Sequence, residues 1–111
     1  MHTLICTKTC SKCREAVKLL DERGSTYTYR EYTKEPLSAD EIREVLGRLG
    51  MTAREALRDR DAKKAGLSGS ESDDELIALM ADNPRLLQRP ILLTDKGAAM
   101  GRPVENLLAV L

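Results

Sequence analysis

Apolar and polar residues alternate with two different periods along the chain, and these periods predict its first elements. Residues 3–6 form the short apolar run of a strand. From 11 to 23 the pattern changes to a helical one, ending before Gly24, with apolar residues at Cys13, Ala16, Val17 and Leu20. The Tyr- and Thr-rich residues 26–31 predict a second strand. Because about twenty residues separate the two strands, we expect a right-handed crossover and a parallel pair.

The middle of the chain carries signals for helix starts. A capping box places Glu or Gln three residues after a Ser or Thr that precedes the first helical turn. Three such pairs occur: Ser38 with Glu41, Thr52 with Glu55, and Ser72 with Glu75. We therefore expect helices at 39–49, 53–57 and 73–82, the first ending at Gly50 and the last before Asn83-Pro84.

The last third of the chain predicts a hairpin and a final helix. Residues 90–94 form an apolar run followed by Asp95-Lys96-Gly97, a turn signal, with 98–101 as the partner strand. Arg102-Pro103 then opens a helix whose predicted buried stripe is Val104, Leu107, Leu108 and Leu111. The resulting order is strand-helix-strand, a helical insertion, then strand-strand-helix, which is an α/β fold.

Composition and charge narrow the class of protein. The 111 residues suit one domain, and 41% are hydrophobic although Phe and Trp are absent. Lys and Arg total 18 against 18 Asp and Glu, so no net charge attracts nucleic acid or an anionic membrane, and we expect neither as a direct partner. No signal sequence or membrane-spanning run is present, which predicts a cytoplasmic protein.

Three cysteines, Cys6, Cys10 and Cys13, fall within eight residues. In a reducing cytosol, such a cluster more often binds a metal or takes part in catalysis than forms a structural disulfide. Cys10 stands where the first helix begins, so unpaired backbone N–H groups, the helix dipole and nearby Lys and Arg side chains should stabilise its thiolate. A lowered pKa predicts Cys10 as a nucleophile.

Cys13 lies one helical turn after Cys10, on the apolar stripe, which predicts a shielded resolving thiol. Positions i and i+3 of a helix lie within the roughly 4.4 to 6.8 Å Cα separation that a disulfide needs. A bridge closing so short a loop adds little stability, so its use would be redox exchange. A C-x-x-C motif beside a strand-helix-strand pattern is typical of thioredoxin-like redox chemistry.

Three other interpretations of the cluster remain open at this point. The spacing C-x-x-x-C-x-x-C also occurs in enzymes that hold an iron–sulfur cluster. A zinc site needs a fourth ligand, for which His2 is the candidate. Alternatively all three cysteines are small buried hydrophobic residues, which is the favoured interpretation for Cys6 alone. Redox use of Cys10 is favoured over the other interpretations.

Several segments together resemble a known family, the ArsC/Spx family, which includes the glutaredoxin-coupled arsenate reductases and the Spx regulators. The resemblance covers essentially the whole chain and rests on Thr9-Cys10-Ser11-Lys12-Cys13-Arg14, REALR at 54–58, SDDELIALM at 72–80, LLQRPILLT at 86–94 and GRPVENLL at 101–108. It implies a thioredoxin-like fold, as a single domain over 1–111 with a helical insertion at about 37–87. The Arg-Pro pairs at 89–90 and 102–103, taken with Cys10, are its most specific parts.

The resemblance also implies a site. Cys10 would attack arsenate, held by oxyanion-binding residues that match Arg58, Arg89 and Arg102, and Pro90 matches a proline that is typically cis. Guanidinium groups pair well with tetrahedral oxyanions. No bound cofactor or metal is expected. An external dithiol donor, either glutathione with glutaredoxin or thioredoxin, would recycle the enzyme.

Cys13 distinguishes two hypotheses about activity. Arsenate reductases of this family commonly have Ser or Thr three residues after the nucleophile, whereas the C-x-x-C here resembles the Spx side. We favour an arsenate reductase-like thiol oxidoreductase in which Cys13 resolves the Cys10 intermediate to a disulfide. The alternative is a redox-sensing transcriptional regulator, similar to Spx, that binds RNA polymerase under control of the Cys10–Cys13 disulfide.

Overall fold

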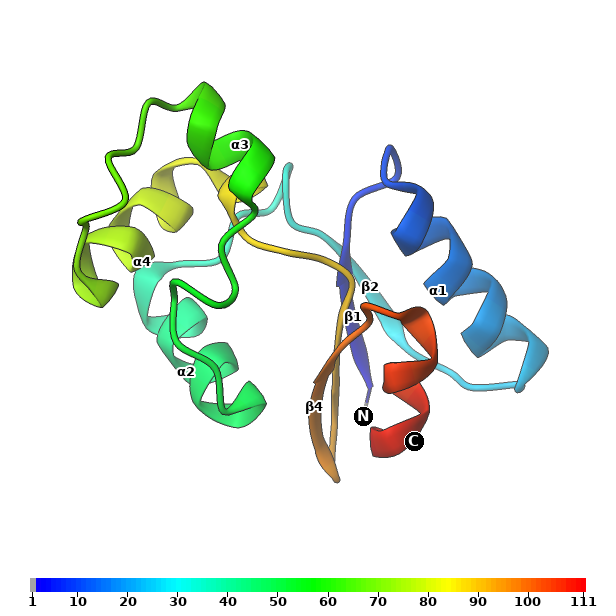
Figure 1. Ribbon diagram of the computed structural model, residues 1–111. Coiled ribbons are helices and arrows are strands. Elements are labelled where there is room, and N and C mark those ends of the chain that lie inside the picture. Colours follow the sequence, from blue (N-terminus) through cyan, green and yellow to red (C-terminus); the bar gives the residue numbers. More distant parts are fainter. Residues whose placement is uncertain (1) are drawn as a thin grey trace. The chain divides into compact units, whose positions relative to one another are not determined.

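The computed structural model describes residues 2–111 and contains two compact units (Figure 1). The first unit combines the residues up to Glu35 with Arg89–Leu111, and the second is Pro36–Gln88. The chain thus leaves the first unit after β2 and returns to it before β3. Within residues 2–111, no helix has the length and apolar character needed to span a membrane.

The first unit is built on a four-stranded sheet in the order β2-β1-β3-β4. Its strands are β1 (Thr3–Cys6), β2 (Thr28–Glu31), β3 (Ile91–Thr94) and β4 (Gly97–Met100). β1 and β2 are parallel, β3 is antiparallel to β1, and β3 and β4 form a hairpin. The parallel pair and the hairpin predicted from the sequence are both confirmed.

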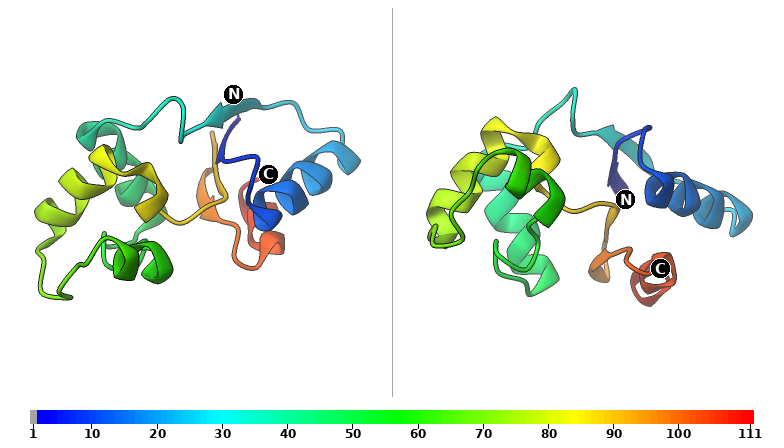
Figure 2. Two further views of the ribbon diagram at one scale, coloured as in Figure 1. Left: turned by 90° about the horizontal axis from the view of Figure 1, so that it is seen from above. Right: turned by 45° about the horizontal axis from the view of Figure 1, so that its top comes forward.

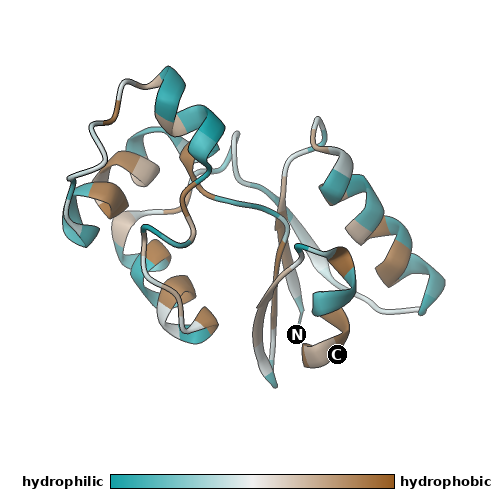
Figure 3. Cartoon of the chain, viewed as in Figure 1, coloured by the Kyte–Doolittle hydropathy of each residue, from teal (hydrophilic) through white to brown (hydrophobic). Residues whose placement is uncertain are grey.

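One face of this sheet is covered by the helix α1 (Ser11–Glu22) and the 3₁₀ helix η2 (Val104–Val110), which lie side by side in the views of Figures 1 and 2. Leu4, Cys6 and Leu92 of the sheet pack there against the buried side of α1. The predicted stripe of α1 is confirmed: Cys13, Ala16 and Leu20 are buried, and Val17 is partly buried against the same cluster. Brown and teal alternate along α1 in Figure 3, as an amphipathic helix requires.

The predicted stripe of the last helix is partly wrong. Leu107 and Val110 are buried, but Leu108 is 37% exposed. The reason is that η2 is a 3₁₀ helix with three residues per turn, so positions 104, 107 and 110 align on one face. The predicted stripe follows the 3.6-residue period of an α-helix instead.

The second unit is helical, as expected. It contains α2 (Ala39–Leu49), α3 (Asp59–Lys64), α4 (Asp73–Asp82) and the short 3₁₀ helix η1 (Pro84–Leu86). The capping boxes at Ser38 and Ser72 are both formed. α2 ends at Gly50, whose φ of 68° lies in the left-handed region that glycine tolerates best.

The helix predicted at 53–57 is not present. Thr52 and Glu55 do exchange the two hydrogen bonds of a capping box, but the chain makes only a turn there. Leu57 instead forms an antiparallel bridge with Leu87, because this segment pairs with the chain around η1. The helix starts later, as α3, with acidic residues in its first turn and lysines in its last, an arrangement that suits the helix dipole.

Candidate functional site

The candidate site lies at one edge of the sheet in the first unit. β1 and β2 both end at this edge because they are parallel, with Cys6 opposite Glu31. β3 begins there and β4 ends there, with Ile91 opposite Met100. The loop before α1, the segment after β2, the segment before β3 and the segment after β4 therefore leave the sheet at the same edge.

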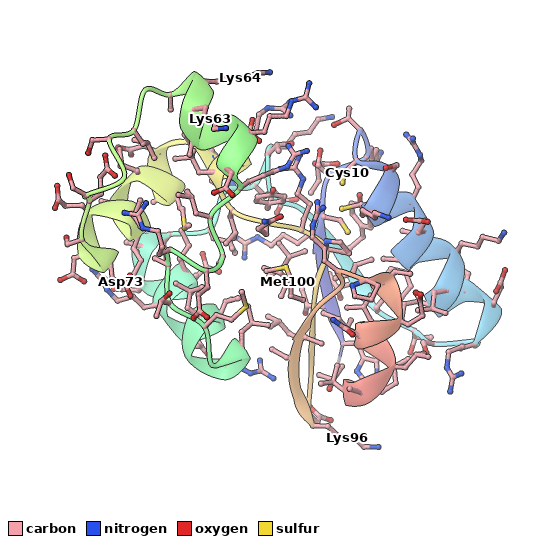
Figure 4. The ribbon with its side chains drawn as sticks, viewed as in Figure 1. Cys10, Lys63, Lys64, Asp73, Lys96 and Met100 are labelled. Carbon is pink, nitrogen blue, oxygen red and sulfur yellow. The ribbon has the colours of Figure 1, made fainter. Side chains whose placement is uncertain are left out.

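Cys10 is the N-cap residue of α1. Its backbone is extended, its carbonyl accepts a hydrogen bond from the Arg14 N–H at 3.1 Å, and its own N–H donates to the carbonyl of Thr7 at 3.3 Å. The side chain is 8% exposed, and Figure 4 shows it beside the first turn of α1. The thiol thus lies at the positive end of the helix dipole, as predicted from the sequence.

Arg102, which follows β4, faces this thiol. Its Nη2 lies 4.0 Å from Cys10 Sγ, while its Nε donates to the carbonyl oxygen of Arg89 at 2.8 Å. The second bond fixes the orientation of the guanidinium plane. The peptide bonds Arg89-Pro90 and Arg102-Pro103 are both cis, the first in agreement with the resemblance described above.

Arg89 is buried, with 2% of its surface exposed, although it is charged. Its Nη1 donates to the hydroxyl oxygen of Tyr32 at 3.0 Å, and its guanidinium also reaches the Cys10 thiol. Burial acts to lower the pKa of Arg89, but Tyr32 and Cys10 outweigh it and raise that pKa above its ordinary value. A fixed positive charge therefore lies next to Cys10.

Cys13 carries an activated thiol. Its Sγ accepts a hydrogen bond from the N–H of Thr7 at 3.4 Å. Its pKa is lowered to about 7, mainly by a hydrogen bond from the Cys6 thiol, against the opposing effect of burial. Thr7, Cys10 and the charge of Arg89 act in the same direction as Cys6. The sequence predicts thiolate stabilisation at Cys10, whereas the lowered pKa in the structure is that of Cys13.

Cys6 shows the opposite behaviour. It ends β1 and is fully buried, and the hydrogen bond to Cys13, burial and the nearby negative charges raise its pKa far above the ordinary value. All three cysteines are free thiols in this structure. Ionisation is therefore disfavoured at Cys6 and favoured at Cys13.

Two contributors to the site were missed from the sequence. Tyr32 is 1% exposed and holds Arg89 through its hydroxyl oxygen, and Thr7 supplies a backbone N–H to Cys13. A signal for Tyr32 existed, because it directly follows a strand parallel to β1 and must leave the sheet at the edge where Cys10 lies. Nothing in the side chain of Thr7 indicates the role of its backbone.

Arg58 belongs to the second unit. It is the N-cap residue of α3, and its Nη1 lies 2.8 Å from Oδ2 of Asp61. Its N–H donates to the carbonyl of Leu86 at 2.7 Å. The structure thus brings Cys10, Cys13, Arg89 and Arg102 together in the first unit, while Arg58 has its contacts in the second.

The metal interpretations of the cysteine cluster find no support. Within residues 2–111, no group of three or more His, Cys, Asp and Glu side chains is arranged to hold a metal ion. The zinc and iron–sulfur alternatives both needed Cys6, Cys10 and Cys13 to converge as ligands. All three instead lie as free thiols in the buried cluster of the first unit.

The sequence of the chain matches a family model, described as the ArsC family, over residues 6–110. The chain belongs to the ArsC family. An arsenate reductase of Neisseria meningitidis is 42% identical to it, over 92% of this chain and 91% of that protein. An uncharacterized protein of Escherichia coli K12 is 39% identical, over 91% of this chain and 88% of its own length.

A solved structure in the ArsC family agrees with the fold. An arsenate reductase from Vibrio cholerae superposes with a TM-score of 0.88 and 31% identity, covering 99% of this chain and 97% of that one. The α/β architecture with its four-stranded mixed sheet is therefore the thioredoxin-like fold of the ArsC family, which confirms the predicted fold class. Homologues that carry the name arsenate reductase are similar to this chain over most of its length.

Proposed function

We propose that this ArsC-family protein is a cytoplasmic thiol oxidoreductase that reduces arsenate, with Cys10 as nucleophile and Cys13 as resolving thiol. The observation that carries the proposal is the position of Cys10, at the start of α1, facing the guanidinium of Arg102 and next to the buried Arg89. Two fixed positive groups beside a thiol suit an anionic substrate and a thiolate alike. The arsenate reductases among its relatives point to the same substrate.

In the first step, the Cys10 thiolate attacks the arsenic(V) of arsenate. A sulfur–arsenic bond forms, an arsenic–oxygen bond breaks, and the departing oxygen takes up protons and leaves as water. Arg102 would pair with the remaining oxygens, and Arg89 would stabilise the negative charge of the adduct from its buried position. By resemblance to the family, we assign Arg58 as the third oxyanion-binding residue.

In the second step, the Cys13 thiolate attacks the sulfur of Cys10. The disulfide forms, the sulfur–arsenic bond breaks, and its electron pair stays on arsenic, which leaves as arsenite. The lowered pKa of Cys13 supports this assignment, because the thiolate is the reactive form at neutral pH. Its place one turn after Cys10 supports a bridge with little backbone movement.

In the last step, an external dithiol donor reduces the Cys10–Cys13 disulfide by exchange. We propose glutaredoxin with glutathione, or thioredoxin, as this donor. A pocket of about 420 Å³ beside Cys13, lined by Lys8, Arg14, Val17, Tyr27 and Tyr29, supports access for a partner from that side. No bound cofactor is part of the proposal.

The test is arsenate-dependent consumption of NADPH in parallel glutathione/glutaredoxin and thioredoxin coupled assays. Cys10→Ser should abolish turnover in both systems. Cys13→Ser should abolish it with thioredoxin, and any residual turnover with glutathione would show that a small thiol can resolve the adduct instead. Arg23→Ala is the matched control, since Arg23 is exposed just after the last turn of α1. Absence of arsenate-dependent turnover by the wild type in both systems would refute the assignment.

A second function is favoured by the same thiol pair. Cys13 has a lowered pKa and lies next to Cys10, so an oxidant could close the disulfide without any oxyanion. In this alternative the protein is a redox-sensing regulator similar to Spx, and the disulfide controls its binding to RNA polymerase. Co-purification with RNA polymerase that depends on the oxidation of Cys10 and Cys13, together with no arsenate turnover, would establish it.

A further inference from the structure

The start of α1 lacks the usual side-chain cap. An N-cap residue is most often Ser, Thr, Asp or Asn, because its side-chain oxygen accepts a hydrogen bond from a backbone N–H of the first helical turn. Cys10 holds this position, and among the described residues its side chain caps no backbone N–H. The thiol is thereby left available for chemistry, and the backbone that leads into α1 is held by other groups.

Glu31, the last residue of β2, is one of these groups. It pairs with Cys6 in the register of β1 and β2, and its side chain reaches the loop that follows β1. Its Oε2 accepts a hydrogen bond from the backbone N–H of Lys8 at 2.9 Å, and its Oε1 accepts one from the Thr33 hydroxyl at 2.8 Å. Both oxygens are engaged, which fixes the direction of the carboxylate.

The N–H that Glu31 holds belongs to the peptide group between Thr7 and Lys8, here called the loop peptide. The carbonyl of the same peptide group accepts a hydrogen bond from the N–H of Cys10 at 3.3 Å. A trans peptide group is planar, and its N–H and C=O point in opposite directions. Because Glu31 fixes the N–H, it also directs the carbonyl toward the backbone of Cys10.

The loop peptide also bears on the second thiol. The N–H of Thr7, next to the loop peptide in the chain, donates to Cys13 Sγ at 3.4 Å. Thr7 is 2% exposed, whereas Lys8 is exposed. Water can therefore replace Glu31 as the acceptor for the Lys8 N–H, but a mobile water does not fix the direction of the loop peptide.

We propose that Glu31 is a positioning residue for the two thiols of the site. Its carboxylate orients the loop peptide, and the loop peptide holds Cys10 and Cys13 in the geometry for disulfide closure. The carboxylate acts through the backbone of the loop and not on the sulfur atoms. This role belongs to the protein without any substrate, while its effect on arsenate turnover rests on the proposed function.

The experiment measures disulfide closure with one equivalent of dithiobis(nitrobenzoate), an aromatic disulfide. The reagent should meet Cys10 first, which is 8% exposed against 1% for Cys13. The Cys10 thiolate attacks the reagent, a mixed disulfide forms and one thionitrobenzoate leaves. The Cys13 thiolate then attacks Cys10 Sγ, the mixed disulfide breaks and a second thionitrobenzoate leaves. The second release is intramolecular, so its rate is independent of reagent concentration, and Cys13→Ser should lack it.

Glu31→Ala should slow the second release roughly tenfold, in line with the loss of one hydrogen bond to a charged group. Glu31→Gln keeps an oxygen acceptor for the Lys8 N–H and should restore most of the rate. Glu35→Ala is the matched control, because it removes an exposed carboxylate from the segment that follows β2, and it should leave the rate unchanged. A merely structural role would lower the melting temperature of Glu31→Ala without changing closure in the folded protein.

Thr33→Val tests the other end of the carboxylate. It removes the hydroxyl that holds Oε1 of Glu31 and should slow closure by less than Glu31→Ala does. Added to Glu31→Ala, it should cause no further slowing, because both changes act through the same side chain. Slowing that adds up in the double variant would contradict the proposed route.

An unchanged closure rate in folded Glu31→Ala would overturn the inference. A Glu31→Gln variant as slow as Glu31→Ala would also overturn it, because the hydrogen-bond acceptor would then play no part. None of these measurements uses arsenate. In the arsenate assay, Glu31→Ala should lower kcat and leave the KM for arsenate unchanged. If arsenate turnover fails while closure responds to Glu31 as expected, the reductase assignment is wrong and this inference stands.

Discussion

At the residue scale, the first unit keeps a guanidinium where water has little access. An isolated buried charge costs several kcal/mol, so such a group persists only when hydrogen bonds and opposite charge surround it. Arg89 finds them in Tyr32 and Cys10, and its backbone carbonyl in turn holds Arg102. A substitution that moves the backbone of Arg89 should therefore also change the orientation of the Arg102 guanidinium group.

The rate of disulfide closure should depend on pH through Cys13. Because its pKa is lowered to about 7, the thiolate predominates above that pH and is lost as the pH falls through it. Below pH 7, closure should slow roughly tenfold for each further pH unit, since only the thiolate attacks. Rapid alkylation after a stoichiometric peroxide pulse measures closure, with Cys13→Ser as the variant that cannot close. A rate that stays flat down to about pH 5 would contradict the prediction.

Arg102 should contribute to anion binding more than to folding. Hydrogen bonds to charged groups are worth about 1.5–3 kcal/mol, so Arg102→Ala should raise the KM for arsenate by roughly 10- to 100-fold. Arg102→Lys keeps the charge but loses the fork that holds the Arg89 carbonyl, and should recover only part of the affinity. The test is to measure the KM for arsenate of both variants by steady-state kinetics, with Arg23→Ala as the control. Equal KM values in all three would remove Arg102 from the site.

Some residues of this site can be predicted from the sequence, and others cannot. Cys10 and Cys13 stand out because their spacing and their place at a helix start carry chemical meaning by themselves. Arg89 and Arg102 are recognisable only through resemblance, since arginine is common in a chain with 32% charged residues. Tyr32 and the N–H of Thr7 act through the tertiary arrangement, which local patterns do not contain.

At the element scale, local sequence signals predict a helix or strand correctly only where pairing with distant segments does not compete with them. The strands, α1, α2 and α4 follow their sequence patterns closely, because caps and periodicity agree with the packing. The turn at 53–57 has a complete capping box but no helix, because its backbone pairs with the chain near Leu87. The buried face of η2 likewise follows a 3₁₀ period, which the spacing of its apolar residues does not reveal.

The 3₁₀ period of η2 predicts that two neighbouring leucines contribute very differently to stability. Leu107 is fully buried, while Leu108 is 37% exposed. Leu107→Ala should lower the free energy of unfolding by about 2–5 kcal/mol, the range for leucines truncated in a core. Leu108→Ala should change it by less than about 1 kcal/mol. Urea unfolding of both variants tests this, and similar losses would indicate an α-helical register instead.

At the scale of the whole molecule, the sequence predicts a single domain, and the structure divides into two compact units. We propose that the units fold as one cooperative domain, since the polypeptide of the first unit is completed only after the second has been made. The chain offers a convenient probe of this proposal. All three tyrosines lie in the first unit, and there is no tryptophan.

A destabilising substitution in the second unit should therefore also lower the melting temperature that is measured through the tyrosines of the first unit. Leu76→Ala removes a fully buried side chain from α4 and should lower the melting temperature followed by tyrosine absorbance as much as that followed by far-ultraviolet circular dichroism. Leu107→Ala, placed in the first unit, is the reciprocal variant. If Leu76→Ala shifts the dichroism transition and leaves the tyrosine transition in place, the units unfold separately.

The second unit enters the chain as an interruption, between Glu35 and Arg89. Three groups of the site, Cys10, Tyr32 and Cys13, are encoded before it, and Arg89 and Arg102 after it. The second unit can be treated as a cassette, whose exchange for the matching segment of a relative leaves every residue of the first-unit site untouched. Such an exchange replaces the segment that carries Arg58, the proposed third oxyanion-binding residue, and leaves the cysteines in place.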